Sequence, residues 1–161
     1  MPPESASRPA RPEDRPYNVA RVPVPDASPL SERANAFINS YWETVTGSGD
    51  RVLPYLNSIY APIVNYYGRP LPKQMILQDK FYFIRRWPIR QTWAAPGAES
   101  PSISCNEAAE ECNIAGVRDF DAVSPERSAR STGVVRYWYE VRFVDGWPQI
   151  VGEQSSVVAS D

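Results

Sequence analysis

The hydrophobic pattern of the chain changes its period near Pro88, and this change limits the folds open to it more than any other feature. Before Pro88, apolar residues recur every three or four positions, which is the spacing of amphipathic helices. After Pro88, apolar and polar residues alternate, as in strands that bury one face. Helices first and strands last indicate an α+β domain, in which three N-terminal helices cover one face of a curved antiparallel sheet.

Residues that start and stop helices set the bounds of the three predicted helices. Ser28 is the expected cap of the first helix, which Gly47 ends. Asp50 caps a second, shorter helix. Pro72 opens the third helix, and Pro88 stops it.

A run of aromatic and basic residues at positions 79–93, DKFYFIRRWPIRQTW, joins the third helix to the first strand after it. It could be a ligand site or a nucleic-acid surface, because basic groups and aromatic rings together bind single-stranded nucleic acid. About half of its aromatic residues are needed for the buried face of the helix, however. Phe81 is expected on that face together with Ile76, Lys80 and Ile84. The run is therefore interpreted as a helix that leads into a strand.

The clearest strand covers residues 134–144. Its residues fall into an inward set and an outward set. The inward set is Val135, Tyr137, Tyr139, Val141 and Phe143, and the outward set is Arg136, Trp138, Glu140 and Arg142. With the other alternating segments and the hairpin signal Asp145–Gly146, this predicts an antiparallel sheet of about four to six strands.

Residues 1–29 differ from the rest of the chain in composition. Many of the seventeen prolines fall there, together with Arg, Ser and Ala. Few large apolar side chains are present to offset the entropy that is lost when such a segment becomes ordered. We therefore expect a disordered, Pro-rich tail or linker over 1–29 and one ordered domain over 30–159.

Charge and residue types exclude several classes of function. The net charge is −2, whereas nucleic-acid-binding domains carry a basic footprint, so no nucleic-acid partner is expected. The chain has no histidine, which excludes Ser-His-Asp and Cys-His catalysis and histidine-containing metal sites. No apolar run approaches the roughly 18 residues of a membrane span, so no direct membrane insertion is expected. No metal site and no cofactor are predicted.

The two cysteines, Cys105 and Cys112, are separated by NEAAEE. Each could be a small buried apolar residue. If SISC and CNIAGV are neighbouring strands, however, the two Cβ atoms can approach the ~3.8 Å that a disulfide requires. A disulfide across this hairpin is the favoured interpretation. It indicates an exported or periplasmic protein, because thiols in the cytosol stay reduced.

The order of the predicted elements and the turn IYAPIVNYYG resemble the nuclear transport factor 2-like superfamily, whose cystatin-like fold is a cone of three helices wrapped by a bent sheet. The resemblance covers residues 30–159. The spaced residues YYG, DK and RWP within 66–88 are also similar to bacterial domains that follow linkers in exported multi-domain proteins, some of them joined to caspase-like peptidases. No peptidase nucleophile motif is present, so the resemblance implies no protease activity.

The superfamily's fold implies a pocket between the helices and the concave face of the sheet. Its enzymes of the ketosteroid isomerase and polyketide cyclase type place an Asp or Glu base there, with a tyrosine or an acid as hydrogen-bond donor. The tyrosines expected to line the pocket are Tyr41, Tyr60, Tyr137 and Tyr139. The weak candidates for the base are Glu153, on a strand face with Val151 and Val157, Asp79, one position off the apolar stripe of its helix, and Asp119, on the strand face opposite Cys112.

The sequence places none of these acids next to a tyrosine, and the inward tyrosines could instead be core residues. No catalytic residue is therefore assigned. The favoured function is a non-catalytic module that binds a small apolar ligand or a protein partner. The alternative is an isomerase, cyclase or dehydratase that acts on a small molecule in the pocket. Trp138 would suit a homodimer through the sheet if it is exposed, but the protein's own loops could equally cover it.

Overall fold

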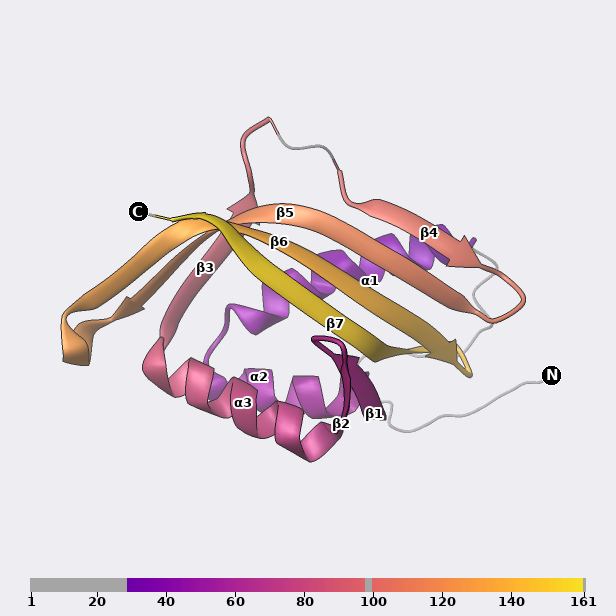
Figure 1. Cartoon of the computed structure of the whole chain (residues 1–161), viewed down its shortest axis with the longest axis horizontal. Helices are drawn as coiled ribbons and strands as arrows, with labels where there is room; N and C mark the ends of the chain where they lie inside the picture. The colour runs from indigo at the N-terminus through magenta and orange to yellow at the C-terminus, as the bar shows by residue number, and fades with distance from the viewer. Residues whose placement is uncertain (1–28, 98–99, 161) are drawn as a thin grey trace.

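The computed structural model describes residues 29–97 and 100–160 (Figure 1). Within these residues the chain forms three α-helices and seven strands. The helices are α1 (Leu30–Val45), α2 (Gly49–Ile59) and α3 (Lys73–Arg86). The strands are β1 (Tyr60–Tyr66), β2 (Arg69–Pro72), β3 (Ile89–Ala94), β4 (Ser102–Asn106), β5 (Glu111–Ser124), β6 (Ala129–Val144) and β7 (Trp147–Ser160). The predicted disordered tail up to residue 28 and the predicted cap at Ser28 lie outside the described residues.

All the described strands belong to one open sheet. Its order is β2-β1-β7-β6-β5-β3, and β4 also pairs with β5. The three helices lie on the concave side of this sheet (Figure 1). The predicted α+β class, with three N-terminal helices on a curved sheet, is therefore confirmed. The sheet differs in two details: it has seven strands, and it is mixed, because β1 runs parallel to β7.

Strand β1 is the source of the mixed pairing. It follows α2 without a loop, since α2 ends at Ile59 and β1 begins at Tyr60. Pro62 lies inside β1, where the pairing with β7 is irregular between Tyr60 and Asn65. A proline cannot donate a hydrogen bond to a neighbouring strand and is tolerated at such irregular positions. Local sequence patterns cannot specify that a segment this early in the chain pairs with the last strand.

Helix α1 provides the main apolar contact between the helices and the sheet. Its buried residues are Leu30, Ala34, Phe37, Ile38 and Tyr41. This is the spacing of one helix face. They form a single core with buried residues of the sheet, among them Ile114 on β5 and Val141 on β6.

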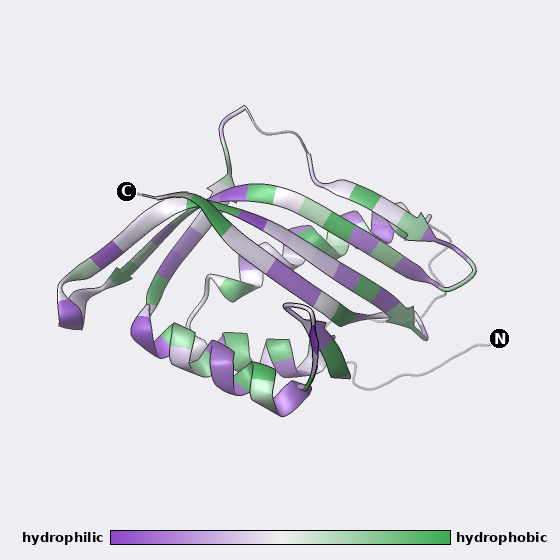
Figure 2. Ribbon diagram, viewed as in Figure 1, coloured by the Kyte–Doolittle hydropathy of each residue, from purple (hydrophilic) through white to green (hydrophobic). Residues whose placement is uncertain are grey.

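The alternation predicted for residues 134–144 is present in β6, where Tyr137, Tyr139, Val141 and Phe143 are buried. Figure 2 shows hydrophilic and hydrophobic bands alternating along β5 and β6. On the other face, the Trp138 ring covers Gly152 so closely that a Cβ atom there would lie 2.8 Å from Cη2. Trp138 Nε1 donates a hydrogen bond to Oδ1 of Asn113 at 3.1 Å. Trp138 thus packs on its own sheet, and the homodimer through this face stays a prediction.

The predicted disulfide between Cys105 and Cys112 is present. The two residues are opposite one another in the β4–β5 hairpin, with 4.0 Å between their Cα atoms, and their sulfur atoms are bonded. Cys112 is completely buried on the inner face of β5. The bond therefore ties the edge strand β4 to the core strand on which α1 packs.

Helix α3 packs differently from the prediction. Of its fourteen residues, all of which the structure describes, Ile76 alone is buried. Phe81, predicted to face the core, is 40% exposed. Met75, Tyr82 and Phe83 are 50% to 57% exposed. The placement of Phe81 was therefore wrong. Apolar residues occur on every side of this helix, so their spacing does not select the side that is buried.

A buried arginine joins the helices to β3. The Arg90 guanidinium donates hydrogen bonds to the carbonyl oxygens of Val45 and Gly47, at the end of α1, and of Trp87, at the end of α3. Carbonyl groups at a helix C-terminus lack partners within the helix and attract a cation. Burial lowers the pKa of Arg90. Among the described residues, no helix has the length and apolar character needed to cross a membrane.

Candidate functional site

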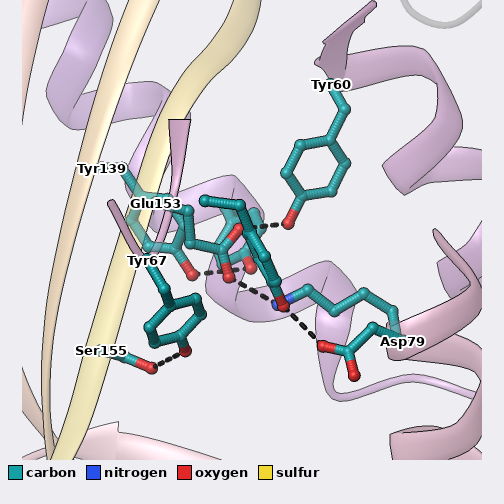
Figure 3. A network of polar contacts seen from close by, with 9 residues as sticks. Tyr60, Tyr67, Asp79, Tyr139, Glu153 and Ser155 are labelled. Atoms are coloured by element: carbon teal, nitrogen blue, oxygen red, sulfur yellow. Dashed lines mark hydrogen bonds and ion pairs between the residues drawn. The ribbon is translucent and has the colours of Figure 1, made fainter. Parts of the chain in front are cut away.

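The candidate site is a group of polar side chains enclosed between β1, β7 and α3, with Glu153 at its centre (Figure 3). Glu153 is only 2% exposed. A bulge at Val151, which has no opposite residue on β6, aims it inward. One extra residue in a strand reverses the face to which the following side chains point. Glu153 consequently lies on the inner face of the sheet, beside its cross-strand partner Tyr139.

Both carboxylate oxygens of Glu153 accept hydrogen bonds from within the protein. The hydroxyl of Tyr60, at the start of β1, donates to Oε1. Lys80, on α3, donates through Nζ to Oε2 at 2.5 Å. Tyr60 is completely buried, and the side chain of Lys80 is 20% exposed. The carboxylate is thus paired and hydrogen-bonded, as a buried charge must be to remain stable.

The ion pair with Glu153 keeps Lys80 charged. Burial is the largest single influence and lowers the pKa of Lys80, but the carboxylate of Glu153 and the surrounding tyrosine hydroxyls together raise that pKa by more, and the result lies well above the ordinary value. Nζ also lies 5.6 Å from the centre of the Tyr66 ring, whose face stabilises a cation. Lys80 is therefore held as the positive member of a largely enclosed ion pair.

Three of the predicted tyrosines close the site on its inner side. The hydroxyl of Tyr139 donates to the hydroxyl of Tyr41 at 2.8 Å, and the two rings meet edge to face with 5.0 Å between their centres. Burial raises the pKa of Tyr41 to about 12 and raises those of Tyr60 and Tyr139 well above their ordinary value. These phenols stay protonated at neutral pH and act as neutral hydrogen-bond donors.

Tyr137 lies in a neighbouring aromatic cluster. Its ring meets Trp42 edge to face at 5.1 Å between centres. It also lies over Gly116, where a Cβ atom would be 2.5 Å from the Tyr137 hydroxyl oxygen. The guanidinium of Arg118 is 5.2 Å from the centre of the Trp42 ring. Tyr137 therefore extends the core next to α1 and does not contact Glu153.

Asp79 lies at the exposed edge of the site. Its Oδ2 accepts a hydrogen bond from the hydroxyl of Tyr66 at 2.7 Å. Beside it, the Tyr67 hydroxyl and the Ser155 hydroxyl are 2.8 Å apart (Figure 3). These contacts connect α3 and β7 to the end of β1 at the molecular surface. Asp79 thus fixes the rim of the site and does not reach its interior.

Asp119 is on the opposite face of the sheet. It pairs with Trp93 across β3 and β5, with its side chain directed away from the face that the helices cover. It borders an open hollow of about 630 Å³, whose other lining residues are Trp93, Phe120, Asp121, Arg130, Thr132, Gly133, Val134 and Ser160. No tyrosine lines this hollow, so Asp119 is not part of an acid–tyrosine arrangement.

The structure thus brings some of the predicted site residues together and separates others. Tyr41, Tyr60, Tyr139 and Glu153 meet in one network, while Tyr137, Asp79 and Asp119 lie outside it. Sequence reasoning missed Lys80 as the partner of Glu153. Its position between Ile76 and Ile84 on the inward face of the third helix was the available signal. Among residues 29–97 and 100–160, no cluster of three or more His, Cys, Asp or Glu side chains could hold a metal ion.

No family model matches the sequence, and no curated protein matches it significantly. Solved structures share the fold. A nuclear transport factor 2-like superfamily protein from Salmonella enterica subsp. enterica serovar Typhimurium str. LT2 has a TM-score of 0.65 at 11% identity, over 80% of this chain and 90% of that one. A candidate scytalone dehydratase from Novosphingobium aromaticivorans DSM 12444 has a TM-score of 0.63 at 10% identity, with 81% and 84% covered.

A third similar structure is an uncharacterised protein with a cystatin-like fold from Caulobacter vibrioides. Its TM-score is 0.61 at 10% identity, over 79% of this chain and 88% of that one. Identities this low show the fold alone. The chain therefore has the nuclear transport factor 2-like, cystatin-like fold that the order of its elements predicts.

Proposed function

We propose that this chain, which has the nuclear transport factor 2-like fold, is a non-catalytic interaction module. One observation carries the proposal: both oxygens of the Glu153 carboxylate are bound by the protein's own Tyr60 and Lys80, and Glu153 is 2% exposed. The carboxylate at the position where a base would act is used to hold the fold together.

A catalytic base has to reach a proton of the substrate within hydrogen-bond distance. A substrate could reach Glu153 only by displacing Tyr60 or Lys80, and removing one partner of a buried ion pair typically costs about 3–5 kcal/mol. The hydroxyls of Tyr41 and Tyr139 are likewise bonded to each other and are buried. The polar groups around Glu153 are thus bonded to one another, which favours a module that binds through its surface over one that binds a small apolar ligand inside.

A thermal-shift screen tests this proposal with steroids, phenols and polycyclic ketones as probes. A bound ligand at about 100 times its Kd adds roughly 2.7 kcal/mol to the free energy of unfolding and raises the Tm by several degrees. We expect no such shift with any of the three classes. A shift in the wild type that disappears in Tyr139→Phe would show an occupied interior site and overturn the proposal.

An isomerase, cyclase or dehydratase is the second candidate. The direct hydrogen bond between Tyr60 and Glu153 supports it, because an acid beside a phenol is the pairing such chemistry uses. The similarity to a candidate scytalone dehydratase points the same way. This function requires Lys80 to leave Glu153 when substrate binds. Turnover of any probe ligand that Glu153→Gln abolishes, in a variant that remains folded, would establish it.

The confirmed disulfide supports a location outside the cytosol, because such bonds persist in oxidising compartments. We propose that the module is exported or periplasmic. Non-reducing mass spectrometry of protein taken from its native compartment should find Cys105 and Cys112 bonded. Free alkylation of both thiols would contradict this location.

A further inference from the structure

Helix α3 carries a large apolar surface that faces solvent. Its outer face, defined here as Met75, Phe81, Tyr82 and Phe83, consists of side chains that are 40% to 57% exposed. Fully burying a side chain of this size contributes about 1.5–3 kcal/mol. Phe81, Tyr82 and Phe83, which are consecutive and exposed, therefore contribute only part of this free energy to the folded chain. Contiguous exposed apolar patches of this kind mark interaction sites.

The fold does not need these residues to hold α3 in place. Polar contacts attach the helix along its whole length. Near its start, Lys73 donates to the carbonyl oxygen of Asn57 at 2.9 Å. In its middle, Lys80 pairs with Glu153, and at its end Arg127 donates to the carbonyl oxygen of Arg86 at 2.7 Å. The outer face is therefore free to serve a contact with another molecule.

The surface around the outer face is positively charged. Apart from Lys80, whose charge Glu153 neutralises, helix α3 carries Lys73, Arg85 and Arg86 against a single acid, Asp79, although the whole chain has a net charge of −2. The Arg85 guanidinium lies 5.6 Å from the centre of the Phe81 ring. Close to the C-terminus of the helix, the guanidinium groups of Arg86 and Arg127 both lie over the Trp87 ring. A partner with acidic side chains is thus complementary, whereas a second copy of α3 would bring like charges together.

The positions of the aromatic residues around the helix indicate the shape of the partner. Successive residues of an α-helix point about 100° apart, so Phe81 and Phe83 project from opposite flanks with Tyr82 between them. A flat surface such as a bilayer can touch one flank and the outermost residue, but not both flanks. A groove that encloses the helix can contact all three, as in complexes where a helix lies in an apolar groove.

We propose that the outer face of α3 is the docking surface for a protein that receives this helix in an apolar groove with acidic residues along its rim. The proposal rests on the interaction-module function and names the surface and the chemistry of the partner. Phe81, Tyr82 and Phe83 enter the groove, and Arg85 and Arg86 pair with its rim.

Photo-crosslinking in the cells that produce the full chain tests the proposal. The crosslinking residue p-benzoylphenylalanine replaces Tyr82, and in a matched control it replaces Val144, which is 48% exposed at the end of β6. We expect a crosslink at position 82 to a different protein, in a segment that combines apolar and acidic residues. We expect the crosslink yield at position 144 to be at least about tenfold lower, because Val144 lies outside the docked face and makes no close contact with the partner.

Two further variants separate the parts of the proposal. Phe83→Ser removes one flank contact, and the double variant Arg85→Glu/Arg86→Glu reverses the rim charge. Each should lower the crosslink yield at position 82 by about tenfold while the circular dichroism spectrum stays that of the wild type. Crosslinking to a second copy of the chain, to its own N-terminal residues or to lipid would overturn the proposal, as would equal yields at positions 82 and 144. Failure of the non-catalytic function would instead appear in the ligand screen and leave these yields unchanged.

Discussion

Helices α1 and α3 lie on the same concave side of the sheet, but different interactions hold them there. Helix α1 buries Leu30, Ala34, Phe37, Ile38 and Tyr41 against the sheet. Helix α3 fully buries Ile76 alone among its described residues, while Leu77 and Ile84 pack partly buried against the core. Hydrogen bonds and the ion pair between Lys80 and Glu153 provide the rest of its attachment. Apolar residues stabilise the fold in α1, whereas in α3 the exposed Phe81, Tyr82 and Phe83 remain available to a partner.

The comparison shows that an apolar residue in a helix predicts a buried position only when the apolar residues of that helix share one side. In α1 the apolar residues share one side, and that side is buried. In α3 apolar residues occur on more than one side and alternate with polar and charged residues. Within this chain, α3 packs against α2 and against strands β1 and β2. The exposed apolar residues on the other side support the proposed contact with a partner.

The largest expected effect is on the α1 side. Phe37 is buried in the core, and truncation of a buried phenylalanine leaves a cavity. Phe37→Ala should lower the free energy of unfolding by about 3–5 kcal/mol, measured by urea denaturation. A loss below about 1 kcal/mol would show that α1 is not anchored by its apolar face.

The next effect concerns the ion pair that holds α3. Lys80→Met leaves the Glu153 carboxylate buried without its cation and should cost roughly 2–4 kcal/mol, below the value for a fully buried pair because Lys80 is 20% exposed. The double variant Lys80→Met/Glu153→Gln should be more stable than Lys80→Met alone, because it removes the unpaired charge. If the losses of unfolding free energy in the two single variants simply add in the double variant, Lys80 and Glu153 do not interact directly.

A smaller effect appears at high pH. Burial raises the pKa of Tyr41 to about 12 in the folded state, against about 10 in an unfolded chain. The folded protein therefore holds this proton more tightly, so the associated stability is complete below about pH 10 and is lost as the pH rises towards 12. The loss from this group is roughly 2–3 kcal/mol. Between these pH values, the free energy of unfolding of Tyr41→Phe should fall less steeply with pH than that of the wild type. An equal slope in the two proteins would exclude Tyr41 as a contributor.

The smallest effect is expected on the outer face of α3. Phe83→Ala is the counterpart of Phe37→Ala with the same pair of residue types, but Phe83 is 50% exposed. The free energy of unfolding should change by no more than about 0.5 kcal/mol, as at other surface positions. A loss comparable to that of Phe37→Ala would mean that the outer face serves the fold and not a partner.

The sequence was sufficient for the fold class, because the change of period near Pro88 is a local signal. The alternation in 134–144 correctly placed Tyr137 and Tyr139 inside, and the spacing of Cys105 and Cys112 predicted their bond. The parallel pairing of β1 with β7 could not be predicted, because it joins segments that are far apart in the chain.

The candidate site was predictable only in part. The inward tyrosines and Glu153 follow from strand and helix patterns, although the inward direction of Glu153 depends on the bulge at Val151. The pairing of Glu153 with Lys80 depends on how α3 crosses the sheet, which no local pattern contains. Phe81 was misplaced for the same reason, since tertiary contacts such as those of Ile76 and Lys80 determine which side of α3 faces inward.

Hydrogen exchange of the Lys80→Met variant tests most directly the central claim that the ion pair with Glu153 holds α3. The measurement compares backbone amide protection in α3, residues 73–86, with that in α1, residues 30–45, under conditions where the variant remains folded. The account predicts that exchange in α3 becomes faster than in the wild type while exchange in α1 changes much less. Unchanged protection in α3, or an equal loss of protection in both helices, would contradict it.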